Sequence, residues 1–317
     1  MSETAHILRI EKISPNDGKG LRTVVFFKGC PMRCQWCSTP ESQKKALELC
    51  CNITRCTLCG KCIPSCPHQA LSLKKASNRI LVDKDRCDSC FKCVSTCPSR
   101  GLGTYGRQMT VSEVMKHIVR DEIFYHHSGG GVTLSGGDVL CQPEFARNLL
   151  IACKGSGIHT MAELNMFGDF KNIALLLPHL DAFYVDIKLM DAELHKKWTG
   201  VDNTGILRNT RQAAAVSPAG ALRIRIPLIW NVNDDQENIA ATADFCLSLA
   251  SCGEMEFLPY HRLGQAAHVY TWRDYPLKDM QAMTPAEALA KVAFLKNMNF
   301  PFPIKVSGET LLTAHRR

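Results

Sequence analysis

Apolar segments and amphipathic segments alternate along most of this chain. Residues 23–27 form a continuous apolar run, typical of a parallel strand that is buried on both faces. Further strands are predicted at residues 129–138, 157–163, 182–188, 222–229 and 254–261, and helices at residues 109–119, 143–153, 171–180, 191–199, 203–214, 238–251 and 285–297. Strands that alternate with helices predict a parallel sheet with right-handed crossovers. We therefore predict an α/β fold, a partial (β/α)6 TIM-like barrel of six strands with its chemistry at their carboxyl ends.

Two further local signals predict the elements that neighbour this pattern. Residues 7–13 alternate as in a strand, and residues 14–20 are rich in turn formers. Thr110 is followed three residues later by Glu113, which predicts a capping box at the start of the helix over residues 109–119.

The alternation is interrupted by an internal repeat. Cysteines at residues 56, 59, 62 and 66, followed by Pro67, recur with the same spacing at residues 87, 90, 93 and 97, followed by Pro98. We divide the chain into the start of the barrel at 1–47, a ferredoxin-like insertion at 48–103 and the remainder of the barrel at 104–317, with a return linker at 101–106. Cys50 and Cys51 fall outside both runs and are left unassigned.

Each run has the spacing of a bacterial ferredoxin, in which the fourth cysteine binds the other cluster. One [4Fe–4S] cluster is therefore assigned to Cys56, Cys59, Cys62 and Cys97, and the other to Cys66, Cys87, Cys90 and Cys93. A pair of zinc knuckles is the alternative, and the doubled pattern with proline after each last cysteine disfavours it.

A third group of cysteines follows the first apolar strand. Cys30, Cys34 and Cys37 have the spacing C-x3-C-x2-C, with no fourth cysteine at a matching distance. Three thiolates on one loop can hold three irons of a [4Fe–4S] cluster and leave the fourth iron open to a small molecule. A zinc clip or three buried thiols are the alternatives. Trp36, between the second and third cysteines, is expected to shield this cluster from solvent.

Polar residues gather where the predicted strands end. These are Glu163, Asp186, Lys188, Arg225 and His261, with the glycine-rich string Ser135, Gly136, Gly137 and Asp138 after an earlier strand. Because the carboxyl ends of parallel strands share one edge, we expect a common polar pocket there. Adjacent glycines let the backbone approach a ligand closely, although most such strings are plain turns.

Composition narrows the class of protein. Hydrophobic residues make up 45% and charged residues 21% of the 317 residues, as in globular proteins. We expect a cytoplasmic enzyme without a membrane span, because no long apolar run or signal peptide is visible. The 17 cysteines, in a reducing compartment, indicate metal binding. The net charge of +8 is spread without a dense basic stripe, so no nucleic-acid partner is expected.

The cysteine loop carries a resemblance. Cys30, Cys34 and Cys37 resemble the signature of radical S-adenosylmethionine (SAM) enzymes, and residues 20–42 resemble the activating enzymes of glycyl radical enzymes. One departure is Thr39-Pro40, where many relatives have Asn-Pro. The resemblance implies three [4Fe–4S] clusters and SAM as cofactors.

The resemblance also implies roles for the polar residues. Ser135, Gly136 and Gly137 match a string that holds the amino group of SAM, and Asp138 stands where relatives have Glu. Asp186 and Lys188 match an Asp-x-Lys string that contacts SAM. Glu163, Arg225 and His261 match positions near SAM, and Asn165 is a weaker candidate.

The implied activity is anaerobic activation of a partner. A 5′-deoxyadenosyl radical from SAM would take a hydrogen from a backbone glycine of a glycyl radical enzyme, with flavodoxin or ferredoxin as the reductant. We expect a monomer. Two alternatives stay open: a radical SAM enzyme that acts on a small molecule, and an iron–sulfur electron carrier. The insertion could relay electrons, brace the fold or help to dock the partner.

Overall fold

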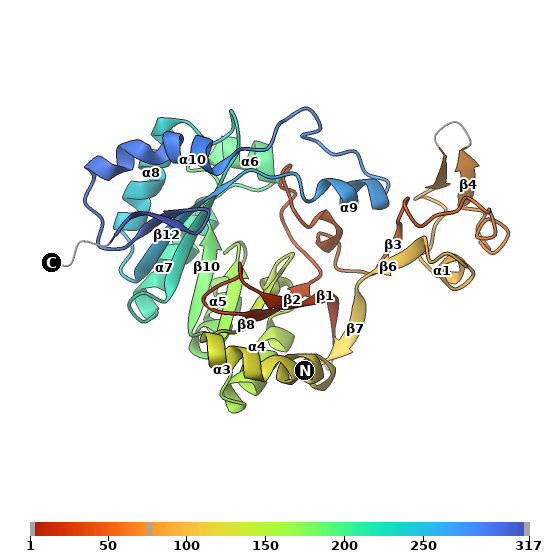
Figure 1. The fold of residues 1–317 in the computed structure, drawn as a ribbon, viewed down its shortest axis with the longest axis horizontal. Helices are drawn as coiled ribbons and strands as arrows, with labels where there is room; N and C mark the ends of the chain where they lie inside the picture. The colour runs from red at the N-terminus through yellow and green to blue at the C-terminus, as the bar shows by residue number, and fades with distance from the viewer. Residues whose placement is uncertain (1–3, 75–77, 314–317) are drawn as a thin grey trace.

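The computed structural model describes residues 4–74 and 78–313, and its main feature is a mixed sheet of ten strands (Figure 1). The strand order is β14-β13-β12-β11-β10-β9-β8-β2-β1-β7. The strands are β1 (Thr4–Ser14), β2 (Arg22–Phe27), β7 (Arg107–Thr110), β8 (Gly131–Gly136), β9 (Thr160–Leu164), β10 (Ala182–Asp186), β11 (Leu222–Leu228), β12 (Cys252–Pro259), β13 (Ile304–Val306) and β14 (Glu309–Leu312).

Strands β2, β8, β9, β10, β11, β12 and β13 run parallel to one another. The outer strands β1, β7 and β14 are antiparallel to their neighbours. Six of the parallel strands are the predicted ones. The predicted number is too low by one, because β13 is also parallel to its neighbour β12. This strand has only three residues and follows Pro301 and Pro303, so its local sequence indicates a turn.

Helices connect the strands in the predicted order. They are α2 (Val111–Ile118), α3 (Glu122–Ser128), α4 (Pro143–Gly155), α5 (Phe170–Leu176), α6 (Ala192–Thr199), α7 (Thr204–Val216), α8 (Gln236–Leu247), α9 (Gln265–Tyr270) and α10 (Pro285–Val292), with 3-10 turns η1 (Pro40–Ser42), η3 (Val119–Asp121), η4 (Val139–Cys141), η5 (Leu177–His179) and η6 (Ala293–Asn297). The capping box of Thr110 and Glu113 is confirmed at the start of α2. No helix in the described part of the chain is long and apolar enough to cross a membrane.

The two faces of the parallel strands differ in chemistry. Phe183 and Val185 of β10 belong to the main hydrophobic core, and Tyr184, between them, lies outside that cluster. Side chains alternate between the faces of a strand, so Tyr184 and Asp186 share the opposite face. We call this the inner face of the sheet. It carries the polar residues described below.

The insertion forms a separate small lobe that projects from the sheet (Figure 1). Its elements are β3 (Glu48–Cys51), β4 (Leu71–Lys74), β5 (Arg79–Val82), α1 (Lys92–Ser95) and β6 (Leu102–Tyr105). The return linker predicted at residues 101–106 is mostly a strand, because Leu102–Tyr105 form β6, which pairs antiparallel with β3. Gly103 lies opposite Cys50 in this pairing.

The segment that includes α9 joins the insertion to the sheet, and Figure 1 shows this helix between the two. The Trp272 indole Nε1 donates a 2.7 Å hydrogen bond to the carbonyl of Ile80 in β5. Arg273 donates to the carboxylate of Glu48 at 2.6 Å and to the carbonyl of Pro40 at 2.7 Å. These contacts fix β3 and β5 of the insertion to the segment that follows α9. They also fix that segment to Pro40, which follows the cysteine loop.

Candidate functional site

The loop with Cys30, Cys34 and Cys37 leaves the carboxyl end of β2 and closes on itself. The Cys30 amide donates to the carbonyl of Gln43 at 3.0 Å, which ties the two ends of the loop together. The Arg33 amide donates to the carbonyl of Thr199 at 2.6 Å, so the loop is also fixed to the end of α6. The backbone therefore holds the three cysteines in one compact loop at the strand end.

Burial changes the acidity of these thiols. It raises the pKa of Cys34 to about 12, and it raises the pKa of Cys30 and of Cys37 as well. A thiolate is the form that binds metal. Buried thiolates need nearby positive charge, and the irons of a cluster would supply it.

Gly136 and Gly137 lie directly against this loop. A Cβ on Gly137 would lie 2.2 Å from the carbonyl oxygen of Gly29, and Gly136 has a φ of +109°. A larger residue would therefore clash at either position, because the end of β8 passes close to the end of β2. The Asp138 amide completes this contact by donating to the carbonyl of Gly29 at 2.7 Å.

The carboxylate of Asp138 is engaged with backbone. One oxygen accepts from the Leu140 amide at 2.7 Å and the other from the Asn165 amide at 3.2 Å. Burial raises the pKa of Asp138 to about 7, and the side chain is almost completely enclosed. The Asn165 side-chain amide lies 3.7 Å from Cys30 Sγ. Asp138 thus positions Asn165 beside the first cysteine of the loop.

Lys188 and Asp186 form an ion pair of 2.8 Å near the cysteine loop. Burial works against the charge of Lys188, but Asp186 and the neighbouring Cys34 raise its pKa above the ordinary value. The lysine is enclosed while Asp186 is partly exposed. This pair therefore offers a fixed cation and an accessible carboxylate at the end of β10.

Arg225 is the centre of a second group on the inner face. Its guanidinium contacts Glu163 at 2.5 Å and Glu256 at 3.3 Å, and it lies 3.6 Å from the centre of the Tyr184 ring. Burial works against the charge, but Glu163 raises the pKa of Arg225 above its ordinary value. The Ser135 hydroxyl donates to Glu163. Five strands therefore contribute to one connected polar group.

Glu256 and Tyr184 are not among the predicted site residues. Their register explains the contacts, because Arg225 is opposite Glu256 in β12 and Tyr184 is opposite Glu163 in β9. A signal was present: residues 254–257 alternate between acidic and apolar side chains, which is unusual for a parallel strand buried on both faces.

His261 and Trp36 are placed differently. His261 is exposed, and its ring accepts from the Leu263 amide at 3.4 Å. The turn it begins reaches the cysteine loop, since a Cβ on Gly264 would lie 2.2 Å from the carbonyl oxygen of Cys37. Trp36 is 8% exposed and packs in the main core.

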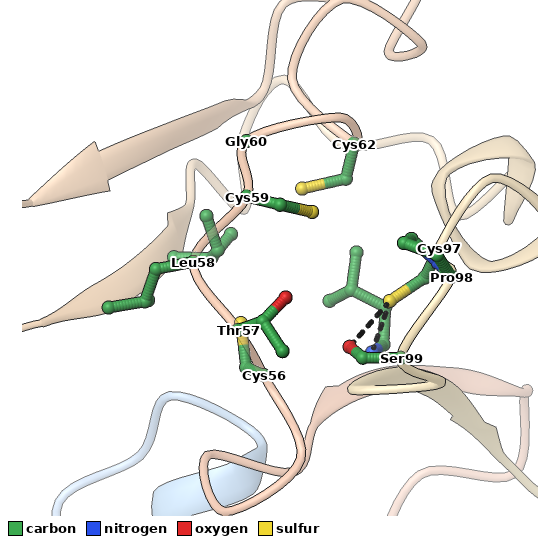
Figure 2. A pocket seen from close by; sticks show the side chains of 11 residues that line it. Cys56, Thr57, Leu58, Cys59, Gly60, Cys62, Cys97, Pro98 and Ser99 are labelled. Carbon is green, nitrogen blue, oxygen red and sulfur yellow. Dashed lines mark hydrogen bonds between the residues drawn. The ribbon is translucent and has the colours of Figure 1, made fainter.

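The insertion brings its eight repeated cysteines together as two sets of four. The lining of the first hollow includes Cys56, Cys59, Cys62 and Cys97. The lining of the second includes Cys66, Cys87, Cys90 and Cys93. Figure 2 shows the side chains of the first set directed toward a common space.

Backbone amides donate to Cys97 and Cys66, the two cysteines that each belong to the set of the other run. The Leu102 amide donates to Cys97 Sγ at 3.4 Å, and the Ala70 amide to Cys66 Sγ at 3.3 Å. In the described ranges no three His, Cys, Asp or Glu side chains are close enough to hold a single metal ion. Sulfurs that surround a hollow suit the larger volume of a cluster. Cys51 is buried in the insertion core and Cys50 is half-buried on the same strand.

The comparisons with known proteins follow this geometry. Residues 55–100 match the family model described as a 4Fe-4S dicluster domain. The chain is 39% identical to an isethionate sulfite-lyase activating enzyme of Oleidesulfovibrio alaskensis, over 90% of this chain and 94% of that protein. It is also 39% identical to a trans-4-hydroxy-L-proline dehydratase activating enzyme of Clostridioides difficile, over 87% of this chain and 90% of that protein.

A crystallised domain of a pyruvate-formate lyase-activating enzyme from Bacteroides vulgatus is 29% identical, with a TM-score of 0.46, and covers 57% of this chain and 100% of that domain. The dicluster match, together with the two sets of four cysteines that line its hollows, defines an iron–sulfur protein. Within that class, the chain belongs to the radical SAM activating enzymes of glycyl radical enzymes.

Proposed function

We propose that this enzyme uses SAM and three [4Fe–4S] clusters to abstract a hydrogen from a backbone glycine of a partner glycyl radical enzyme. The observation that carries the proposal is the position of the three-cysteine loop. It lies at the end of a parallel strand, against Gly136 and Gly137 and near the ion pair of the buried Lys188 with the partly exposed Asp186. This arrangement supports a cluster site beside charged side chains of both signs, which suit a zwitterionic ligand.

The cysteines divide into three ligand sets. Cys30, Cys34 and Cys37 would hold one cluster with an open iron, and the two sets of four in the insertion would each hold a complete cluster. When bound and reduced, the first cluster supplies one electron that cleaves SAM to methionine and a 5′-deoxyadenosyl radical.

The residues of this chain bind and orient SAM. Lys188 would attract the carboxylate of SAM, and Asp186 its amino group. Arg225 and Glu163 would offer a second pair of opposite charges on the inner face. Ser135 and His261 stay candidates for further contacts. Asp138, with both oxygens already accepting from backbone, would position Asn165 and the loop.

The fold proposal is a partial barrel. Polar side chains from five strands converge through Arg225, which supports curvature of the sheet toward its inner face. We propose the boundaries 1–47, 48–103 and 104–317 for the two parts of the barrel and the insertion. The family-model match at residues 55–100 lies within the second.

The partner is a glycyl radical enzyme, and its own substrate stays open. Relatives named for isethionate sulfite-lyase and for hydroxyproline dehydratase are equally similar, at 39% identity. Identity to these two relatives therefore does not distinguish between the partners in their names. We propose a ferredoxin or flavodoxin as the reductant and a monomeric state for the activating enzyme.

One experiment tests the catalytic part. The reconstituted and reduced protein, kept anaerobic, should release 5′-deoxyadenosine from SAM, and Cys34→Ala should abolish that release. Cys50→Ala is the matched control, because this cysteine lies outside all three ligand sets. Both insertion clusters should persist in Cys34→Ala. Equal release from the Cys34 variant and the wild type would refute the assignment of the loop.

A further inference from the structure

The insertion carries most of the net charge of the protein. Residues 48–103 contain nine basic and four acidic residues, a net +5 of the chain's +8. Residues 49–82 and 89–112 contain no Asp or Glu. Three of the four acidic residues therefore lie between residues 83 and 88, at the start of the second cysteine run.

The rim of the first hollow is purely basic. We define this first rim as Arg55, Lys61 and Arg100, each of which is next in sequence to a residue that lines the hollow. All three side chains are exposed, and none forms an ion pair with an acidic side chain in the described part of the chain. Cys59, one of the lining cysteines in Figure 2, is exposed as well.

The rim of the second hollow has mixed charge. Arg86 and Lys92 occupy the positions that match Arg55 and Lys61 in the repeat. Asp88, however, lines this hollow itself and lies 2.9 Å from the ring of His68. Asp85 adds a second exposed acid beside Arg86.

The fourth cysteine of each run lines the other run's hollow, and this explains why the first rim has a third cation, Arg100. Cys97 belongs to the first hollow, so Arg100, which follows it, joins the first rim. The matching residue after Cys66 is Gln69, which is next in sequence to the lining residue Ala70 and has no charge. The two halves of one repeat thus present different charges to solvent.

The first hollow also touches the rest of the protein. Ile80 lines it, and the carbonyl of Ile80 accepts the hydrogen bond from Trp272. Its exposed side is basic, and its inner side is joined to the segment that packs against Cys37 through Gly264. The second hollow has no such contact to this segment among its described lining residues.

We propose that the first rim docks a small acidic one-electron carrier protein, and that electrons enter the enzyme at the first hollow. This rests on the proposed function, in which Cys56, Cys59, Cys62 and Cys97 hold a [4Fe–4S] cluster. One electron leaves the carrier, which is oxidised, and reduces that cluster from the 2+ to the 1+ state. The transfer forms and breaks no covalent bond. Opposite charges guide the encounter, and salt weakens it.

The test uses the full reconstituted chain and an acidic flavodoxin in its hydroquinone form. Stopped-flow absorbance would give the bimolecular rate of cluster reduction for wild type, for Arg55→Gln/Lys61→Gln and for the matched control Arg86→Gln/Lys92→Gln. At low ionic strength the first variant should react on the order of tenfold more slowly, and the control should stay within about twofold of wild type. At high salt the three rates should converge.

A second readout needs no turnover. Calorimetric titration with oxidised flavodoxin should show weaker binding to the first variant alone. Equal losses in both variants, or none in either, would overturn the proposal. Iron content must stay at about twelve per chain in each protein. SAM cleavage driven by dithionite separates the two hypotheses: if it persists in both variants while flavodoxin rates are equal, docking is wrong and the proposed function stands.

Discussion

The insertion and the inner face of the sheet are built in opposite ways. In the insertion, each hollow takes three cysteines from one short run and one from the other run. On the inner face, the polar group around Arg225 draws one residue from each of five strands, spread from Ser135 to Glu256. The first site depends on local spacing, and the second on the register of a whole sheet.

Their cores differ accordingly. The insertion core has few buried apolar residues, and two of its seven buried members are the predicted ligands Cys62 and Cys93. The main core instead draws on strands and helices from residue 5 to residue 306. A lobe of this size gains only marginal stability from burial, and this one has a small apolar core. The comparison therefore predicts that the lobe depends on its clusters and the sheet does not.

Removal of iron gives the largest expected effect. Chelation of the full chain should abolish the protection of amides in β4, β5 and α1, because cluster binding supplies much of the folding free energy of such a lobe. Amides in β9, β10 and β11 should remain protected. Hydrogen exchange read by mass spectrometry measures both regions in one sample. Retained protection of β5 in the iron-free chain would contradict this account.

The next largest effect is expected for Ile80→Ala, which tests whether the two cores unfold independently. This side chain is 1% exposed in the insertion core, and its loss should cost about 2–5 kcal/mol of local stability. Ile224→Ala, at a fully buried position in β11, is the matched control and should cost a similar amount in the sheet. Exchange rates should rise in the insertion for the first variant and in the sheet for the second. A uniform rise in both variants would mean that the two regions unfold together.

Arg225→Gln tests the long-range polar group. It leaves Glu163 and Glu256 without their shared cation, and because Glu163 is partly exposed, we expect a loss of about 1–3 kcal/mol in the free energy of unfolding. Arg223→Gln removes a 3.3 Å contact to the Tyr184 hydroxyl and a 5.7 Å cation–π contact to the Tyr184 ring, and should cost less. Thermal unfolding without SAM gives the order of the two losses. If Arg223→Gln proves the more damaging, Arg225 is not the centre of the group.

The same contrast explains what the sequence could predict. The cysteine runs and the capping box of Thr110 are local patterns, and the structure places the eight repeated cysteines in the two predicted sets of four. Glu256 and Tyr184 were missed because their importance depends on which residues lie opposite in neighbouring strands. The strand β6 was missed because it forms by pairing with β3, about 50 residues earlier in the chain.

The smallest effect concerns the junction between the two regions. His268 in α9 is 6% exposed and packs edge-on against Tyr275, with ring centres 5.2 Å apart. Burial, and then the charge of Arg273, lower its pKa below the ordinary 6.5. The folded chain therefore resists a proton that the unfolded chain accepts. The stability that this neutral ring contributes is complete above pH 6.5 and is lost as the pH falls below that value.

We expect the junction around α9 to loosen between pH 6.5 and 5, by no more than about 1.4 kcal/mol per pH unit. Hydrogen exchange of residues 264–273, corrected for intrinsic rates, measures this loosening. His268→Gln cannot take up the proton and should show a flat profile in the same range, whereas the exposed His127→Gln should follow wild type. If His268→Gln kept the full pH dependence, the acid sensitivity of the junction would not come from this ring, and the proposed cause would be wrong.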